Sequence, residues 1–139
     1  MNERLSGGCL CGAVRFTAIP KNDEMGVCHC GMCRRWTGGV FMAVDCEVLD
    51  IEDGAKLGVY RSSDYGERVF CAVCGSSLFW RMQDGSHSVV ALQAFDDPSR
   101  FRFTSEIFVD EKPATYAFAN ETKKMTGSEF VAAMTGEGA

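Results

Sequence analysis

Three cysteines within six residues constrain this chain more than any other feature of its sequence. They form the pattern Cys28-x-Cys30-x-x-Cys33. Residues two apart on an extended segment point to the same face, and Gly31 permits a tight turn that brings Cys33 back towards the other two thiols. Three convergent thiols suit a zinc ion, which takes thiolate ligands in tetrahedral geometry. Because three protein ligands leave one corner open, the spacing favours a catalytic zinc site over a closed structural one.

A fourth protein ligand would turn this cluster into a second structural site. Cys46 follows a short apolar run closely enough to fold back, and His29 lies between two of the cysteines, although strand geometry points its side chain away from them. An iron–sulfur centre is also compatible with a set of thiolates. Arg34 and Arg35 follow the cluster directly, either as ordinary surface charge or as groups that grip a substrate carboxylate.

Four further cysteines supply the ligand number that closes a structural zinc site. Cys9-x-Cys11 lies near the start of the chain, and Cys71-x-x-Cys74 is followed by Gly75, which lets backbone amides turn towards the sulfurs. A shared metal would tie the beginning of the chain to its middle, and its binding energy would become folding energy. The alternative is that Cys9 and Cys11 are simply small buried side chains, since free cysteine is often buried.

Composition and charge exclude several other classes of protein. The chain has 139 residues and is 46% hydrophobic, which predicts one domain over residues 1–139. The first residues lack the apolar run of a signal peptide, and the longest apolar run, from 40 to 44, is too short to cross a bilayer. We therefore expect a cytoplasmic protein whose eight cysteines act as ligands and not as disulfides. A net charge of -5 argues against binding to nucleic acid or to an anionic membrane.

Short strand patterns separated by Gly and Asp turns predict an all-β domain. The chain has one helix signal, because Thr126 and Glu129 have the spacing of a capping box ahead of residues 130–134. The predicted strands are residues 8–18, 25–28, 40–44, 47–51, 57–61, 67–70, 78–82, 87–94, 101–104 and 106–109.

Three motifs in order carry a resemblance to a known family. The motifs are Gly7-Gly8-Cys9-Leu10-Cys11-Gly12-Ala13-Val14, Cys28-His29-Cys30-Gly31-Met32-Cys33-Arg34-Arg35 and Phe70-Cys71-Ala72-Val73-Cys74-Gly75-Ser76-Ser77-Leu78. With them the chain resembles the glutathione-dependent formaldehyde-activating enzymes, also called the GFA or CENP-V/GFA domain family. The resemblance covers about residues 5–110 and leaves 111–139 as a C-terminal extension. In one late segment the chain departs from the family, with Glu106-Ile107-Phe108 where members often carry a His-Ile-Trp-like run.

The resemblance implies a β-tent zinc-binding fold of several short antiparallel sheets with two zinc ions per chain. A structural zinc would be held by Cys9, Cys11, Cys71 and Cys74, and a catalytic zinc by Cys28, Cys30 and Cys33. The family's carbon–sulfur lyase activity joins glutathione and formaldehyde reversibly as S-hydroxymethylglutathione, so the implied partners are a small thiol and an aldehyde.

Two other functions remain compatible with the same cysteines. In one, both zinc sites are structural and the protein is a binding module without catalysis. In the other, the thiols sense redox state or metal and release zinc reversibly when they are oxidised. The sequence does not indicate an oligomeric state.

Overall fold

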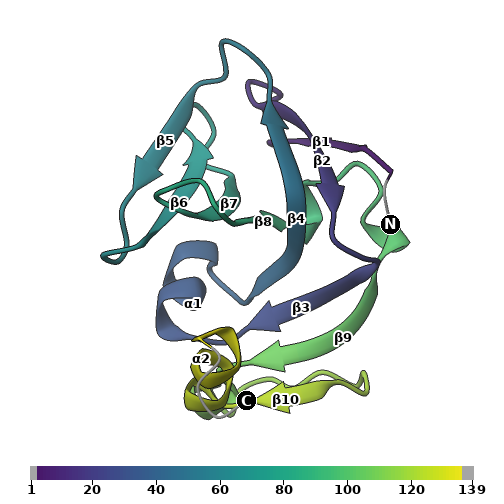
Figure 1. Ribbon diagram of the computed structural model, residues 1–139, viewed down its shortest axis with the longest axis vertical. Coiled ribbons are helices and arrows are strands. Elements are labelled where there is room, and N and C mark those ends of the chain that lie inside the picture. Colours follow the sequence, from purple (N-terminus) through teal and green to yellow (C-terminus); the bar gives the residue numbers. More distant parts are fainter. Residues whose placement is uncertain (1–2, 136–139) are drawn as a thin grey trace. The chain divides into compact units, whose positions relative to one another are not determined.

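Residues 3–135 are described by a computed structural model, and strands make up most of its regular structure (Figure 1). This confirms the predicted β class. The contacts divide the chain into two compact units. The first unit combines the residues up to Asp23 with Ala43–Phe101, and the second combines Glu24–Met42 with the residues from Arg102 onward.

The first unit is built from antiparallel strands only. β1 pairs with β2, β2 with β4, β4 with β8, β8 with β7, β7 with β6 and β6 with β5. The strands are β1 (Leu5–Gly8), β2 (Arg15–Pro20), β4 (Phe41–Ile51, all but its first two residues in this unit), β5 (Leu57–Tyr60), β6 (Gly66–Cys71), β7 (Ser77–Met82) and β8 (Ser88–Ala91). The short 3-10 helices η1 (Leu92–Ala94) and η2 (Pro98–Arg100) follow β8.

Aromatic rings fill the core of the first unit. The ring of Phe16 packs edge-on against Phe79 with centroids 5.0 Å apart, and against Phe95 at 5.7 Å. Val14, Val69 and other apolar side chains around these rings are fully buried. The alternation of buried and half-buried residues along β2 follows the two faces of a strand.

The second unit contains parallel strands. β3 (Glu24–Cys28) and β10 (Lys123–Met125) each pair in parallel with β9 (Arg102–Ile107), and Figure 1 shows the three lying side by side. Parallel neighbours need long connections, and these hold α1 (Gly31–Thr37) and the 3-10 helix η3 (Val109–Glu111), while α2 (Gly127–Thr135) follows β10. No helix within residues 3–135 is both long and apolar enough to cross a membrane.

The structure corrects several predicted elements. The strand predicted over 8–18 is correct for residues 15–18, which lie in β2, but residues 9–14 form a turn between β1 and β2, where Gly12 has a φ of 84°. The strands predicted at 40–44 and 47–51 are one strand, β4, and those at 101–104 and 106–109 are replaced by β9. The sequence pattern gave no sign of α1 or β10. The predicted C-terminal helix is confirmed, because Thr126 Oγ1 accepts from Glu129 N at 3.2 Å and Glu129 Oε1 accepts from Thr126 N at 2.8 Å.

Candidate metal centres

Four cysteines of the first unit bring their sulfurs to one place. The sulfurs of Cys9, Cys11, Cys71 and Cys74 all lie within 4.8 Å of one another, and we call this set the four-thiol cluster. Cys9 and Cys11 converge because the chain turns at this point and not, as the sequence suggested, because they share the face of a strand. Cys9 N donates to Val14 O at 3.0 Å, which closes the turn.

The other half of the four-thiol cluster is a tight knuckle after β6. The amides of Val73 and Cys74 both donate to Cys71 Sγ at 3.4 Å, as the Cys-x-x-Cys-Gly pattern predicts. Gly75 completes the knuckle with a φ of 82°, a conformation that favours glycine. Ser76 ties the halves together, because its Oγ accepts from Leu10 N at 3.1 Å and lies 3.2 Å from Cys74 Sγ.

Crowding separates the pKa values within this cluster. Hydrogen bonds from the Ser76 side chain and backbone lower the pKa of Cys74 to about 5. The pKa of Cys11 is raised to about 11, because burial and the neighbouring thiols outweigh the lowering effect of the Ala13 amide. Four thiolates this close cannot all ionise without a compensating cation. The donor set therefore fits a soft divalent metal, and tetrahedral thiolate sites are typical of zinc.

Three cysteines of the second unit form a separate, buried group. The sulfurs of Cys28, Cys30 and Cys33 also lie within 4.8 Å of one another, and we call this set the three-thiol cluster. Cys28 ends β3, and Cys30 is the N-cap of α1, whose Sγ accepts from Cys33 N at 3.3 Å. Gly31 opens this helix and does not make the tight turn expected from the sequence. All three side chains are buried, and the presence of Cys30 and Cys33 raises the pKa of Cys28 far above its usual range.

His29 points away from the sulfurs into a buried hydrogen-bond network. Its side chain is fully buried, with Nε2 2.8 Å from Glu106 Oε1 and Nδ1 2.8 Å from the hydroxyl of Tyr116. Both ring nitrogens are thus engaged, and His29 does not belong to the three-thiol cluster. Sequence reasoning gave His29 its correct direction but found neither partner, because both lie more than seventy residues away along the chain.

The remaining candidate residues differ in exposure and contacts. Arg34 is half-buried, and its Nε donates to His29 O at 3.0 Å, whereas Arg35 is exposed. Cys46 is buried on β4, where its Sγ donates to Val44 O at 3.6 Å. Burial raises the pKa of the Cys46 thiol to about 12.

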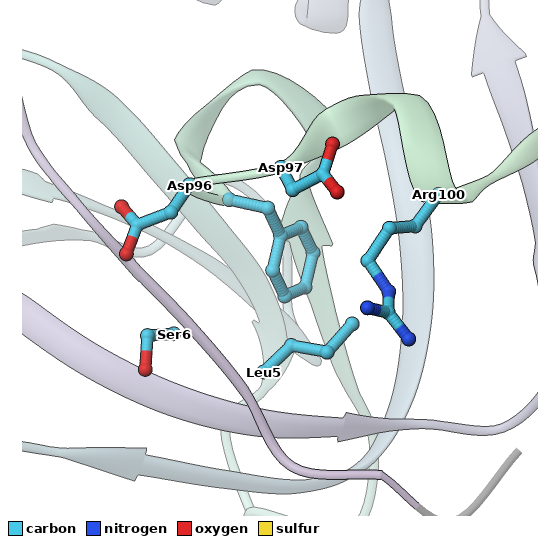
Figure 2. A pocket seen from close by; sticks show the side chains of 6 residues that line it. Leu5, Ser6, Asp96, Asp97 and Arg100 are labelled. Atoms are coloured by element: carbon cyan, nitrogen blue, oxygen red, sulfur yellow. The ribbon is translucent and has the colours of Figure 1, made fainter.

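A small pocket of about 110 Å³ in the first unit is lined by residues other than cysteine. Leu5, Ser6 and Phe95 form one part of it, and Asp96, Asp97 and Arg100 the rest. Figure 2 shows that the side chains of Asp96 and Asp97 extend in different directions. Asp96 is already paired with Arg15, at 2.8 Å, so the pocket presents no convergent set of catalytic groups.

Comparisons with known proteins identify a family and two similar proteins. Residues 4–111 match the family model described as glutathione-dependent formaldehyde-activating enzyme. An uncharacterised lyase of Schizosaccharomyces pombe is 33% identical over 125 residues, which cover 88% of this chain and 91% of that protein. A Halomonas elongata protein, provisionally named a glutathione-dependent formaldehyde-activating enzyme, is 33% identical over 85 residues, or 54% of each chain.

One solved structure supports the fold. A Rhodobacter sphaeroides protein in a crystal structure matches with a TM-score of 0.57 and 23% identity, covering 72% of this chain and all of that one. At this identity the likeness concerns the fold alone. The family match and the two named relatives together support an enzyme.

Proposed function

The chain belongs to the glutathione-dependent formaldehyde-activating enzyme family, and from this premise we propose that it is a zinc-dependent carbon–sulfur lyase. Its substrate would be the adduct of a small thiol and an aldehyde, such as S-hydroxymethylglutathione. The observation that carries the proposal is the three-thiol cluster, which offers three sulfur ligands within 4.8 Å and no fourth from the described residues of the second unit. A metal held by three protein ligands retains a position for a substrate.

The two cysteine clusters take different roles in this proposal. Cys9, Cys11, Cys71 and Cys74 would hold a structural zinc ion, and Cys28, Cys30 and Cys33 a catalytic one. A zinc ion bound by the three-thiol cluster would lower the pKa of a substrate thiol and polarise a carbonyl oxygen. The protein's own contribution is the fixed direction of the three sulfurs, which the end of β3 and the N-terminus of α1 set.

The reaction itself forms or breaks one carbon–sulfur bond. In the direction of synthesis, the sulfur of the thiolate attacks the aldehyde carbon, the carbonyl π electrons move to oxygen, and the oxygen takes up a proton. Cleavage reverses these steps, and no oxidant or reductant is needed. Arg34 and Arg35 would bind the carboxylates of an anionic thiol such as glutathione, since guanidinium groups pair well with carboxylates. Arg35 is the more exposed of the two.

The decisive assay follows thiol and aldehyde in both directions with zinc-loaded, reduced protein. We expect acceleration over the uncatalysed addition, and we expect Cys30→Ser to abolish it. Cys30→Ser is a gentle change, because serine is a preferred N-cap and keeps the hydrogen bond from Cys33 N. Arg35→Ala should raise KM for glutathione more than for an uncharged thiol. A rate equal to that of buffer for every thiol and aldehyde pair would refute the proposal.

A binding module with two structural sites predicts a different result. It would hold two ions, but cobalt in the three-thiol cluster would keep its absorption spectrum when glutathione is added. Our proposal expects a change, because glutathione sulfur would enter the open position. No disulfide joins any of the eight cysteines, all of which lie within residues 3–135, and this supports the reducing cytoplasm as the site of action.

A further inference from the structure

His29, which lies between the first two cysteines of the three-thiol cluster, forms hydrogen bonds through both its backbone and its ring. His29 N donates to Ile107 O at 3.1 Å, and His29 O accepts from Arg34 Nε at 3.0 Å. Its ring is clamped between Glu106 and Tyr116 at 2.8 Å each. The backbone angles of His29 set the directions in which Cys28 and Cys30 leave the chain. Whatever fixes His29 therefore also fixes two of the three sulfurs.

Glu106 is the hydrogen-bond acceptor for the ring of His29. Its side chain is only 2% exposed, yet hydrogen bonds from Thr122 and His29 keep the pKa of its carboxyl below the usual range against the opposing effect of burial. A carboxylate only accepts, so the Nε2 of His29 carries the hydrogen. The Nδ1 atom forms the second hydrogen bond of the ring, with the hydroxyl of Tyr116.

Tyr116 belongs to a segment that contacts β9 in its second half and at its end. We call residues 112–122, between η3 and β10, the strap. At its start, Lys112 Nζ donates to the carbonyl oxygens of Pro113 and Tyr116 and lies 5.0 Å from the centre of the Tyr116 ring. Further on, the ring of Phe118 packs edge-on against Phe103 on β9, with centroids 5.1 Å apart.

The strap ends at a second contact with the same carboxylate. Thr122 Oγ1 donates to Glu106 Oε2 at 2.5 Å, and Lys124, just beyond in β10, lies 3.6 Å from the same oxygen. Glu106 is thus bound by His29 through one oxygen and by the end of the strap through the other. The family model ends at residue 111, so the strap lies outside the part of the chain that it matches.

We propose that Tyr116 is a positioning residue of the three-thiol cluster, and that the strap sets how tightly this cluster holds its metal. Through its hydrogen bond with His29, Tyr116 holds the ring against Glu106 and so holds the backbone between Cys28 and Cys30 in place. Groups that are hydrogen-bonded directly to a metal ligand contribute about 10–100-fold to metal affinity, and because Tyr116 acts through His29 we expect an effect near the lower end of this range. This inference rests on the metal part of the proposed function and not on the thiol and aldehyde chemistry.

The experiment measures metal release from the full chain loaded with zinc. A chelating dye in excess reports release from both clusters, and Cys30→Ser identifies the phase that belongs to the three-thiol cluster. We expect Tyr116→Phe, which removes one hydroxyl, to speed that phase by about tenfold or more and to leave the four-thiol phase unchanged. The four-thiol cluster serves as an internal control. Tyr65→Phe, an exposed tyrosine of the first unit, should change neither phase.

Two further readouts separate positioning from a general loss of stability. Thr122→Val removes the other hydroxyl of the network and should act in the same direction as Tyr116→Phe. Cobalt bound to the three-thiol cluster should change its absorption spectrum in Tyr116→Phe, since these bands report ligand geometry. Native release rates in both variants would overturn the inference, as would equal acceleration of both phases. If the native protein holds only one ion, in the four-thiol cluster, then the proposed function fails as well.

Discussion

Removing the N-terminal half of the four-thiol cluster should destabilise the protein far more than removing a ligand from the three-thiol cluster. The test compares the double variant Cys9→Ser/Cys11→Ser with Cys30→Ser. Cys9 is half-buried and Cys11 exposed, so serine at either position causes little strain of its own. Cys30→Ser keeps the N-cap of α1. The two variants therefore differ mainly in which cluster loses its metal ion and the cross-link that the ion makes.

The size of the difference follows from the length of chain that each metal closes. Cys11 and Cys71, whose sulfurs lie 3.8 Å apart, are separated by 60 residues. A cross-link over a loop of that length removes chain entropy from the unfolded state equivalent to about 4 kcal/mol. The three-thiol cluster closes a loop of a few residues only, for which the same relation gives about 2 kcal/mol. For a domain with a total stability of about 5–15 kcal/mol, the first loss is severe.

The assay is urea denaturation of reduced protein with zinc in excess, followed by tryptophan fluorescence. Trp80 lies on β7 in the first unit and Trp36 on α1 in the second, so variants that retain one tryptophan each report on the units separately. We expect the double variant to lose about 4 kcal/mol, with the Trp80 signal changing at the lower urea concentration. Cys30→Ser should lose only about 2 kcal/mol, since it opens a much shorter loop.

Two outcomes would refute this reasoning. Equal destabilisation by the two variants would mean that both clusters stabilise the fold to the same degree, as a binding module with two structural sites requires. A double variant as stable as the native protein would mean that no metal ties the turn at 9–14 to the knuckle at 71–75. Metal content, measured on the same samples, should fall by one ion in each variant.

Three further predictions test individual contacts by urea denaturation. Glu106→Leu should lower the free energy of unfolding by about 2–4 kcal/mol, because it leaves the buried His29 and the half-buried Thr122 without their acceptor, and a loss below about 1 kcal/mol would contradict the network. Thr126→Ala should cost about 1 kcal/mol through the lost N-cap, with Glu129→Gln as the milder control that retains an acceptor. Asp96→Asn should cost less than about 1 kcal/mol at pH 7, because the pair with Arg15 is exposed. Since Arg15 lowers the pKa of Asp96, this contribution is present above the unfolded pKa of about 3.9 and disappears as the pH falls through the folded pKa, so an undiminished difference at pH 2 would contradict it.

Cysteine spacing allowed both clusters to be predicted, because thiols at such intervals have few other uses in a chain of this kind. The local geometry was predicted less well. Residues 9–14 alternate like a strand, but Gly12 with its positive φ breaks the strand and turns the two thiols together. The helix α1 escaped prediction because its seven residues carry no apolar period, and its N-cap is a cysteine in place of the usual serine or aspartate.

The buried network around His29 could not be predicted from local sequence. Glu106 attracted notice only because it departs from a family pattern, whereas the structure makes it the acceptor for His29 and Thr122. The sequence around Tyr116 did not indicate its role, because a single tyrosine outside any motif does not reveal its hydrogen-bond partner. Hydrogen bonds that join residues so far apart depend on the parallel pairing of β3 and β9, which strand patterns alone do not reveal.

The spacing of the two clusters along the chain also dictates an order during synthesis on the ribosome. Cys28, Cys30 and Cys33 leave the exit tunnel together, long before Cys71 and Cys74 can join Cys9 and Cys11. The nascent chain therefore presents its three contiguous thiols to the cellular metal supply first, at a stage when neither Glu106 nor Tyr116 has been made. We expect an ion captured then to exchange more readily than one in the finished protein, because the hydrogen bonds that hold His29 do not yet exist.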